Sequence, residues 1–587
     1  MELTGFAGRW DAPDAVAAMR RHLAAASGHG SSAAQGDCHA PALFEQDDII
    51  IAVRGSPNLP PRELLRAYRE RGAGLLESLS GSFALAAVDR ARRRVLLAVD
   101  RMGIERLAYS ARSGGIVFSS SLAAVARCPT VGARLRPQAL FEFLLLHMVP
   151  APGTVYEGVA KLRAGTCVVF EDGRVTTRRY WTPEFPQRTD APFAALREDL
   201  RNSLTLAVRD CRPDAATGAF LSGGLDSSTV AGLLGSVTAR PPRTFSIGFG
   251  VESHDELNYA RIANRHFGGV ACEYQVTPDD IVTAIPLIAG AFDEPFGNSS
   301  AVPTYFCAKL AAEAGVTHLL AGDGGDEHFG GNERYARQRV FEAYWRLPAG
   351  LRRTLIEPVA GWITAESRIV PLRKFRSYVQ QARIPMPERL ESWNLVYRTD
   401  PAAMLDPELL RAIDPRAPFA AMDEVYHDSK AATLLDRMQC FDWQYTLSDN
   451  DLRKVGVMCR AAGIRVSFPM LDQRVIELAL RVPARLKLRG LELRTFFKRA
   501  MAGFLPPATI AKRKHGFGLP FGAWLKTDAG LADLVYGLLS DLRRRHIVHA
   551  PFVDELIAGH RTGHASYFGY AIWDLAMLEA WLQRHAA

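Results

Sequence analysis

The 587-residue chain has few cysteines, and they are not paired. Its eight cysteines are scattered and form no Cys-x-x-Cys pair, which argues against a zinc site or a disulfide framework and predicts a reducing compartment. The net charge of +8 is not gathered in a basic block or an aromatic-basic stripe, so no nucleic-acid partner is predicted. The longest apolar stretch, at 143–146, is broken by Glu142 and His147 and is too short to span a bilayer. The start of the chain has no signal pattern, so we expect a cytoplasmic protein with no membrane partner.

The length predicts two domains, because one hydrophobic core does not extend over so many residues. Residues 45–180 are typical of short antiparallel strands interrupted by helices, whereas strands alternate with longer helices from about Ala191 and predict a parallel α/β sheet. Helices are predicted to dominate from Phe341 to the end. A proline-bearing connector at 181–187 sets the predicted domains at 1–186 and 187–587. The clearest predicted strands are 49–53, 83–88, 95–99, 116–118, 166–170, 243–249 and 318–322, and the helices within the first domain are 61–71 and 137–146.

One eight-residue loop is the most informative part of the chain. It follows the apolar run 218–220, precedes a predicted helix from Thr229, and consists of Leu221, Ser222, Gly223, Gly224, Leu225, Asp226, Ser227 and Ser228. In a strand–turn–helix, glycines let backbone N–H groups approach phosphates, and serines add donors near the positive end of the helix dipole. Asp226 cannot attract phosphate, so we expect it to hold a Mg²⁺ that bridges the phosphates. The spacing differs from a Walker loop and resembles the pyrophosphate loop of ATP pyrophosphatases, which release AMP. The alternative is a serine-rich turn that caps a helix.

A second loop, at 322–331, combines three carboxylates with five glycines directly after a predicted strand. Ligand-binding loops of an open α/β sheet gather at the carboxyl ends of its strands, so this loop is predicted to face the first one. We predict that Asp326 is the second Mg²⁺ ligand and that Asp323 faces the acyl-adenylate. The alternative is a solvated acidic turn. Asp293 and Glu294 form another acidic loop near this edge, and with Asp449 they are candidates for the substrate side.

The run 512–520 near the C-terminus contains three cations followed by glycines and Phe517, which favours a shaped loop over a solvated helix face. Acyl adenylation drives a carboxylate onto the α-phosphate and expels pyrophosphate, so negative charge develops in the transition state. A fixed lysine stabilises that charge. Lys514 is the predicted catalytic lysine.

These motifs together resemble the asparagine synthetase family almost from end to end. The resemblance implies an ATP-pyrophosphatase domain in which Ser246, Ile247 and Gly248 border the adenine, Gly322 opens the acidic loop, and Lys454 approaches the phosphates. The first domain is similar to the family's Ntn-type glutaminase domain, an α+β sandwich, through residues 81–84, 100–103, Tyr109 and 149–158. ATP and Mg²⁺ are the implied cofactors.

Two departures from that family bear on the reaction. A glutaminase of this class uses a cysteine as the first residue after Met removal, but position 2 is Glu2 and no cysteine occurs before Cys38. We therefore expect a degenerate glutaminase domain. The family's Asp-Arg pair and Glu-Val-Arg triplet are also replaced, by Gly456-Val457 and by Arg465-Val466-Ser467. In the family these charges would pair with a small amino-acid substrate, so a pocket without them is not specific for it. Such a pocket suits a larger acyl substrate that carries its own amine.

The combination resembles the lasso-peptide macrolactam synthetases. These adenylate an Asp or Glu side chain of a precursor peptide, and the peptide's N-terminal amine then closes an isopeptide ring, with positioning supplying much of the rate. The implied partners are the precursor peptide and a leader peptidase or leader-recognition protein. Three other functions stay open. They are an ammonia-dependent asparagine synthetase or related amide ligase, a β-lactam synthetase-like cyclase, and a non-enzymatic scaffold. A β-lactam synthetase places a tyrosine where this chain has Asp323, and a scaffold predicts a damaged phosphate loop.

Overall fold

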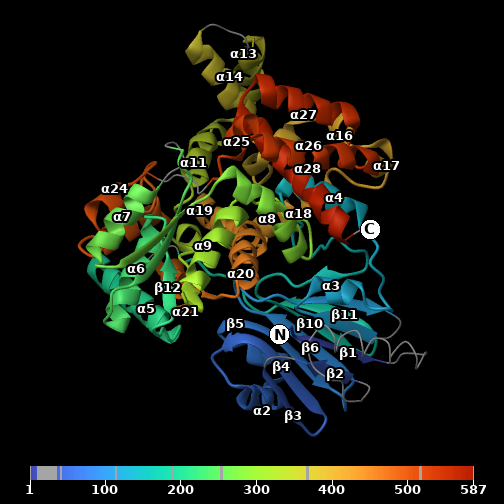
Figure 1. The fold of residues 1–587 in the computed structure, drawn as a ribbon, viewed down its shortest axis with the longest axis vertical. Helices are drawn as coiled ribbons and strands as arrows, with labels where there is room; N and C mark the ends of the chain where they lie inside the picture. The colour runs from blue at the N-terminus through green and yellow to red at the C-terminus, as the bar shows by residue number, and fades with distance from the viewer. Residues whose placement is uncertain are drawn as a thin grey trace.

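A computed structural model describes residues 2–8, 36–39, 42–112, 115–186, 191–251, 256–364, 369–513 and 518–585. Figure 1 shows an N-terminal domain of β-sheets at the lower end, a domain built on a parallel sheet above it, and a helical C-terminal part. No helix among the described residues is long and apolar enough to cross a bilayer.

The N-terminal domain contains two antiparallel sheets. The strand orders are β2-β1-β8-β7-β9 and β11-β10-β6-β5-β4-β3. The strands are β1 Thr4–Gly8, β2 Gly36–His39, β3 Ala42–Gln46, β4 Ile49–Pro57, β5 Gly81–Asp89, β6 Arg94–Val99, β7 Ala108–Arg112, β8 Gly115–Ser119, β9 Ala160–Lys161, β10 Thr166–Glu171 and β11 Arg174–Arg179. The helices are α2 Pro61–Arg71, α3 Leu122–Ala126 and α4 Pro137–Leu146, with the 3-10 helix η1 Gly72–Glu77. The five strands and two helices predicted in this region are confirmed.

The central strands of the six-stranded sheet are covered on both faces. This explains why β5 and β6 have apolar residues at most positions. Along β5, Ala84, Ala86 and Val88 pack with residues of the other sheet, whereas Leu85 and Ala87 pack with α2. Alternate residues of a strand point to opposite faces, so a strand buried on both sides needs apolar residues at every position.

The second domain is built on a five-stranded parallel sheet of order β14-β13-β12-β15-β16. Its strands are β12 Thr217–Phe220, β13 Arg243–Gly248, β14 Val270–Gln275, β15 His318–Leu320 and β16 Arg465–Ser467. The apolar core on one face includes α5 Phe193–Asp210 and α6 Leu225–Thr238, and the core on the other includes α8 Pro278–Ala291, α9 Ala301–Glu313 and α20 Leu452–Ala461. The predicted parallel α/β domain is confirmed, although the sequence analysis did not identify its two edge strands, β14 and the three-residue β16.

Helices make up most of the remainder. They are α7 Leu257–His266, α10 Gly325–Phe329, α11 Glu333–Trp345, α12 Ala349–Leu351, η2 Arg352–Ile356, α13 Glu357–Trp362, α14 Val370–Ala382, η3 Glu388–Glu391, α15 Leu395–Arg398, α16 Pro401–Met404, α17 Pro407–Arg411, α18 Ala417–His427, α19 Leu434–Asp442, η4 Trp443–Asp451, η5 Pro469–Leu471, α21 Gln473–Arg481, α22 Ala484–Lys487, α23 Thr495–Met501, α24 Pro507–Ala511, α25 Phe521–Thr527, α26 Ala529–Leu542, η6 Arg543–Arg545, α27 Ala550–Thr562 and α28 Ala565–His585. The predicted domain boundary falls between residues 186 and 187. Residues 181–186 form neither helix nor strand, and residues 187–190 lie outside the described residues, so the boundary stays a prediction.

Candidate active site

The predicted phosphate loop is a turn between β12 and α6. Gly223 has φ +70°, and a Cβ there would lie 2.3 Å from the backbone N of Ala260, so only glycine fits. The hydroxyls of Ser222 and Ser227 lie 2.9 Å apart, and the backbone N of Ser222 donates to Ser227 Oγ at 3.2 Å. Hydrogen bonds between its own serines therefore fix the shape of the turn at the start of α6. A turn in this position suits an anion.

The acidic loop after β15 packs directly against the phosphate loop. A Cβ at Gly322 would lie 2.7 Å from Ser227 N, and one at Gly325 would lie 2.0 Å from Asp226 Oδ1. These two glycines therefore allow the backbone of the second loop to reach the first. The approach also brings Asp326, in the short helix α10, next to Asp226.

Arg494 joins the two predicted metal ligands. Its Nη1 donates to Asp226 Oδ2 at 2.5 Å and to Asp326 Oδ1 at 2.8 Å, and its Nη2 donates to Asp226 Oδ1. The arginine side chain is 5% exposed, lies directly before α23, and stacks over the ring of Phe497. One cation thus lies between two carboxylates that would otherwise repel each other.

This donor set fits Mg²⁺ held partly by phosphate. Within the described ranges no group of three or more His, Cys, Asp or Glu could hold a metal ion by itself. Mg²⁺ commonly uses one or two protein carboxylates and completes its shell with phosphate oxygens and water. Asp226 and Asp326 already share one cation, so they are close enough to share another. Their role as metal ligands remains a prediction.

Asp323 lies on the same cavity wall and is half-buried. Burial raises its pKa to about 6, against the lowering effect of Lys454. Lys454 forms an ion pair with Asp451 at 2.7 Å. Burial opposes its protonation, but Asp451 and Asp323 outweigh that effect and the pKa of Lys454 lies above its ordinary value. The lysine is therefore a cation held at the cavity wall, and its approach to the phosphates stays a prediction.

These loops surround a cavity of about 840 Å³. Most predicted nucleotide-site residues line it, namely Leu221, Ser222, Gly224, Leu225, Asp226, Ser227, Ser246, Ile247, Gly322, Asp323, Asp326 and Lys454. Gly223, Ser228 and Gly248 are not part of the lining. Ser246 also supports the phosphate loop, since its hydroxyl donates to the carbonyl of Leu221 at 2.7 Å.

The predicted catalytic residue Lys514 lies outside the described residues, so its role stays a prediction. Lys512 is described and lines the cavity. Its ammonium group pairs with Glu256 at 2.9 Å and donates to the carbonyl of Ser222 at 3.3 Å. The sequence analysis did not single out Lys512 or Arg494. The only signal for Lys512 was its membership of the cationic run.

Asp293, Glu294 and Asp449, the candidates for the substrate side, do not line the cavity. Asp293 accepts a hydrogen bond from the backbone N of Leu122, and Asp449, which belongs to η4, accepts one from the backbone N of Ala151. Both contacts cross to the N-terminal domain. The three carboxylates therefore lie where the two domains meet.

Glu294 is the centre of a buried ion network at this interface. It is 1% exposed and pairs with Lys161 of β9 at 2.6 Å and with Arg453 of α20 at 2.5 Å. It also accepts from the backbone N of Val155 at 3.0 Å. Although burial alone would raise its pKa, the charges of Lys161 and Arg453 lower the pKa to about 2. We expect this carboxylate to stabilise the interface.

Gly456, Val457 and 465–467, the positions where the family's charges are replaced, are also outside the cavity lining. Arg465 and Ser467 lie on β16 and hold the ring of His318 between them, at 3.1 and 2.9 Å. The altered triplet thus forms part of the sheet edge.

In the N-terminal domain, Glu2 lies two residues before the start of β1. Its carboxylate pairs with Arg54 of β4 and with Arg460 of α20, and it accepts from the hydroxyl of Ser120. Arg54 also pairs with Glu105 at 3.0 Å. Where the resemblance puts a thiol nucleophile, the chain has an ion-paired carboxylate that contacts both domains.

An Ntn-like sandwich joined to a parallel-sheet domain of the ATP-pyrophosphatase type defines the class of this chain. Residues 199–583 match the family described as asparagine synthase, and residues 62–181 match a glutamine amidotransferase domain. The chain belongs to the asparagine synthase family and is an asparagine synthetase-like ATP-dependent amide ligase.

Individual relatives agree with this assignment. The chain is 24% identical over 524 residues to asparagine synthetase [glutamine-hydrolyzing] 1 of Bacillus subtilis, covering 88% of this chain and 80% of that protein. It is 26% identical over 542 residues to a putative asparagine synthetase [glutamine-hydrolyzing] of Mycobacterium bovis, covering 88% and 78%. Among solved structures, a glutamine phosphoribosylpyrophosphate amidotransferase from B. subtilis matches 55% of this chain and 81% of its own, with 12% identity and a TM-score of 0.21, and the assignment does not rest on this match.

Proposed function

We propose that this chain closes the macrolactam ring of a lasso peptide. A side-chain carboxylate of the precursor peptide attacks the α-phosphate of ATP, which forms an acyl-adenylate and releases pyrophosphate. The peptide's N-terminal amine then attacks the acyl carbon, loses a proton and expels AMP. The product is an isopeptide, and the peptide has lost one water.

The observation that carries the proposal is the contrast between the two domains. The nucleotide cavity keeps its phosphate loop, its two adjacent acidic groups and the fixed cations Lys454 and Lys512. The position of the glutaminase nucleophile is occupied by Glu2 in ion pairs with Arg54 and Arg460. An intact adenylation site beside a domain that lacks its thiol favours a substrate that brings its own amine.

The cavity supports each half of this chemistry. Mg²⁺ bound through Asp226 and Asp326 would neutralise phosphate charge during adenylation. Lys454 is held by Asp451 at the cavity wall, where it would attract phosphate oxygens. Asp323, whose pKa is raised to about 6, is a half-buried carboxyl group beside that lysine, and in this proposal it faces the acyl group. Lys514 would stabilise the charge that develops on the α-phosphate and the acyl oxygen.

The leader of the precursor must be removed before its amine is free, so a peptidase or leader-recognition protein is the proposed partner. Cyclisation then needs the two reacting groups held in one cavity, which replaces a bimolecular amidation by an intramolecular one. The cavity of about 840 Å³ lies toward the upper end of the range for small-molecule sites, and apolar residues such as Val455, Leu491 and Leu493 lie on its wall.

The test is mass spectrometry of a candidate precursor peptide incubated with this protein, its leader peptidase and ATP–Mg²⁺. Loss of one water from the core peptide, with AMP and pyrophosphate formed in equal amounts, is the expected result. Aspartate with ammonia is run in parallel. AMP formed only in that second reaction would contradict the proposal, and Asp226→Ala provides the inactive control for both.

The second candidate is an ammonia-dependent asparagine synthetase or related amide ligase. The similarity to proteins named asparagine synthetase over 88% of this chain favours it. A β-lactam synthetase-like cyclase ranks lower, because Asp323 stands where that family has a tyrosine.

A further inference from the structure

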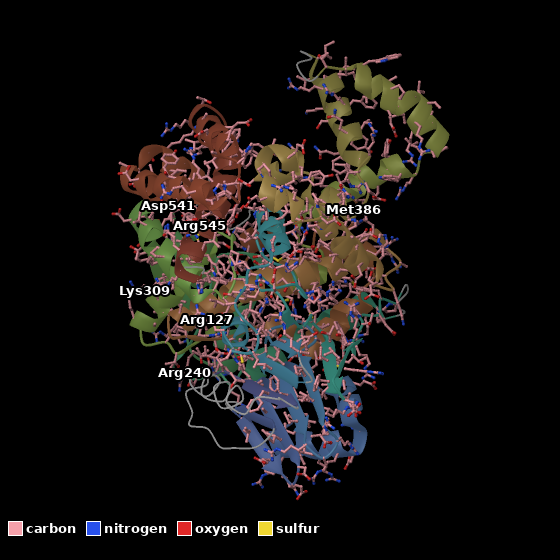
Figure 2. The ribbon with its side chains drawn as sticks, turned by 90° about the vertical axis from the view of Figure 1, so that its right-hand side faces the viewer. Arg127, Arg240, Lys309, Met386, Asp541 and Arg545 are labelled. Atoms are coloured by element: carbon pink, nitrogen blue, oxygen red, sulfur yellow. The ribbon has the colours of Figure 1, made fainter. Side chains whose placement is uncertain are left out.

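A helical projection carries much of the exposed apolar surface of the described residues. We define the projecting hairpin as residues 345–383, from the end of α11 through α12, η2 and α13 to the end of α14, of which 365–368 lie outside the described residues. In Figure 2 this segment stands clear of the body above Met386. Figure 1 shows α13 and α14 at the end of the molecule opposite the N-terminal domain.

The apolar side chains on the hairpin form a row. Leu351, Leu355, Val359 and Trp362 are spaced by four, four and three residues along the continuous segment α12–η2–α13, which places them along one side. Their exposed fractions are 41%, 56%, 37% and 83%. Leu372 and Phe375 of α14 are exposed as well, at 41% and 37%.

The hairpin does not need this row for its own packing. Ala360, Val379 and Ala382 of the hairpin are buried in a small core with Phe341 and Tyr344 of α11. Ala360 therefore faces inward, whereas Val359 beside it in sequence faces outward. Exposed apolar surface of this extent, separate from the core, marks an interaction site.

The charge of the hairpin indicates the partner. Its described residues 346–364 and 369–376 contain six Arg or Lys and one Glu. Arg346, Arg353, Arg373, Lys374 and Arg376 have no acidic partner in the part of the chain that the structure describes, and Glu357 is already paired with Arg383. Exposed cations beside an exposed row of Leu, Val, Phe and Trp are the features by which helices bind the surface of an anionic bilayer.

We propose that the projecting hairpin docks on an anionic lipid surface. The row from Leu351 to Trp362 enters the boundary between headgroups and acyl chains, and the cations of α14 lie over the lipid phosphates. Trp362, the most exposed of the row, suits this boundary because its ring is apolar and its N–H is polar. This docking on lipid departs from the sequence-based expectation of no membrane partner. It does not depend on the macrolactam proposal.

The experiment is co-sedimentation of the full-length chain with vesicles of phosphatidylcholine containing about one-third phosphatidylglycerol, and with pure phosphatidylcholine vesicles. Binding to the anionic vesicles that weakens at high salt is expected, because the Debye length falls to about 3 Å at 1 M. Leu355→Ser with Trp362→Ser, and separately Arg373→Glu with Lys374→Glu, should each weaken binding by about tenfold or more. Val270→Ser and Arg240→Glu are matched controls, since both residues are exposed and Arg240 lies far from the hairpin in Figure 2.

A second measurement avoids dependence on the folding of the double variants. Brominated lipid in the anionic vesicles should quench part of the tryptophan fluorescence, and Trp362→Phe should bind as the wild type does while losing that part. Absence of binding by the wild type, or equal binding by all variants, would overturn the proposal. A third outcome would also overturn the proposal. If the chain does not bind vesicles but forms a dimer, and the double variant Leu355→Ser with Trp362→Ser is monomeric, then a second copy of the chain covers the row.

Discussion

Arg494 reaches Asp226 across 268 residues of sequence and holds its carboxylate through both terminal guanidinium nitrogens. Because Asp326 is bound to the same arginine, one side chain offsets part of the negative charge of the free protein at the place where Mg²⁺ is predicted to bind.

Replacing Arg494 by Met should destabilise the free protein by about 3 kcal/mol, because two carboxylates would be left facing each other without a counter-ion. Mg²⁺–ATP should recover part of that loss. Thermal melts with and without Mg²⁺–ATP measure both effects, and the exposed Arg485→Met is the control. Equal melting temperatures for Arg494→Met and the wild type would contradict the role given to the arginine.

Asp226→Asn and Asp326→Asn should each lower the rate of AMP formation by at least about a hundredfold, since metal-ion stabilisation of phosphate charge is worth several kcal/mol. The measurement is AMP release at increasing Mg²⁺, where the variants should need more metal. Asp541→Asn, at the end of α26 and labelled in Figure 2, should behave as the wild type. Near wild-type turnover in either site variant would remove that residue from the metal site.

Gly223→Ala should weaken ATP binding by tenfold or more, because the added Cβ meets the backbone of Tyr259 and Ala260 at 2.3 Å and the residue has φ +70°. Calorimetric titration with ATP checks this. Gly537→Ala is a matched control within α26, where a Cβ has open space, and it should stabilise the chain by about 0.5–1 kcal/mol. Unchanged ATP affinity in Gly223→Ala would mean that the loop does not hold the nucleotide.

Glu294→Gln should destabilise the chain by about 3–5 kcal/mol, because it leaves Lys161 and Arg453 buried without their carboxylate. Glu424→Gln is the control, since Glu424 also pairs across the domains, with Arg163, but is 64% exposed and should cost about 1 kcal/mol or less. Urea unfolding measures both. Similar losses in the two variants would contradict the importance assigned to burial.

The same network predicts how stability depends on pH. The pKa of Glu294 is about 2 in the folded chain against 4.5 ordinarily, so its contribution is complete above about pH 4.5 and disappears as the pH falls toward 2. Between these values the wild type should lose more stability than Glu294→Gln does. Parallel pH profiles for the two proteins would show that Glu294 does not titrate as described.

The sequence was sufficient for features that depend on local pattern. The phosphate loop, the acidic loop and the helices 61–71 and 137–146 were predicted from turns and periodicity, and the parallel sheet explains why the two loops meet. Arg494 and Lys512 were missed, because an arginine or lysine among 71 basic residues carries no local sign of a partner hundreds of residues away. Glu294 was assigned to the substrate side because an acidic loop that faces a cavity and one that faces another domain are alike in sequence.

The ion network around Glu294 also bears on why a domain without its nucleophile persists. Lys161 belongs to the N-terminal domain, and Glu294 and Arg453 belong to the other, so the buried lysine of the first domain is paired only by a carboxylate of the second. Deleting the first domain would leave the ligase with exposed apolar surface and would remove one of the two cations that hold Glu294. A domain can therefore lose its reaction during evolution and still be retained, because its neighbour has come to require it as part of its own fold.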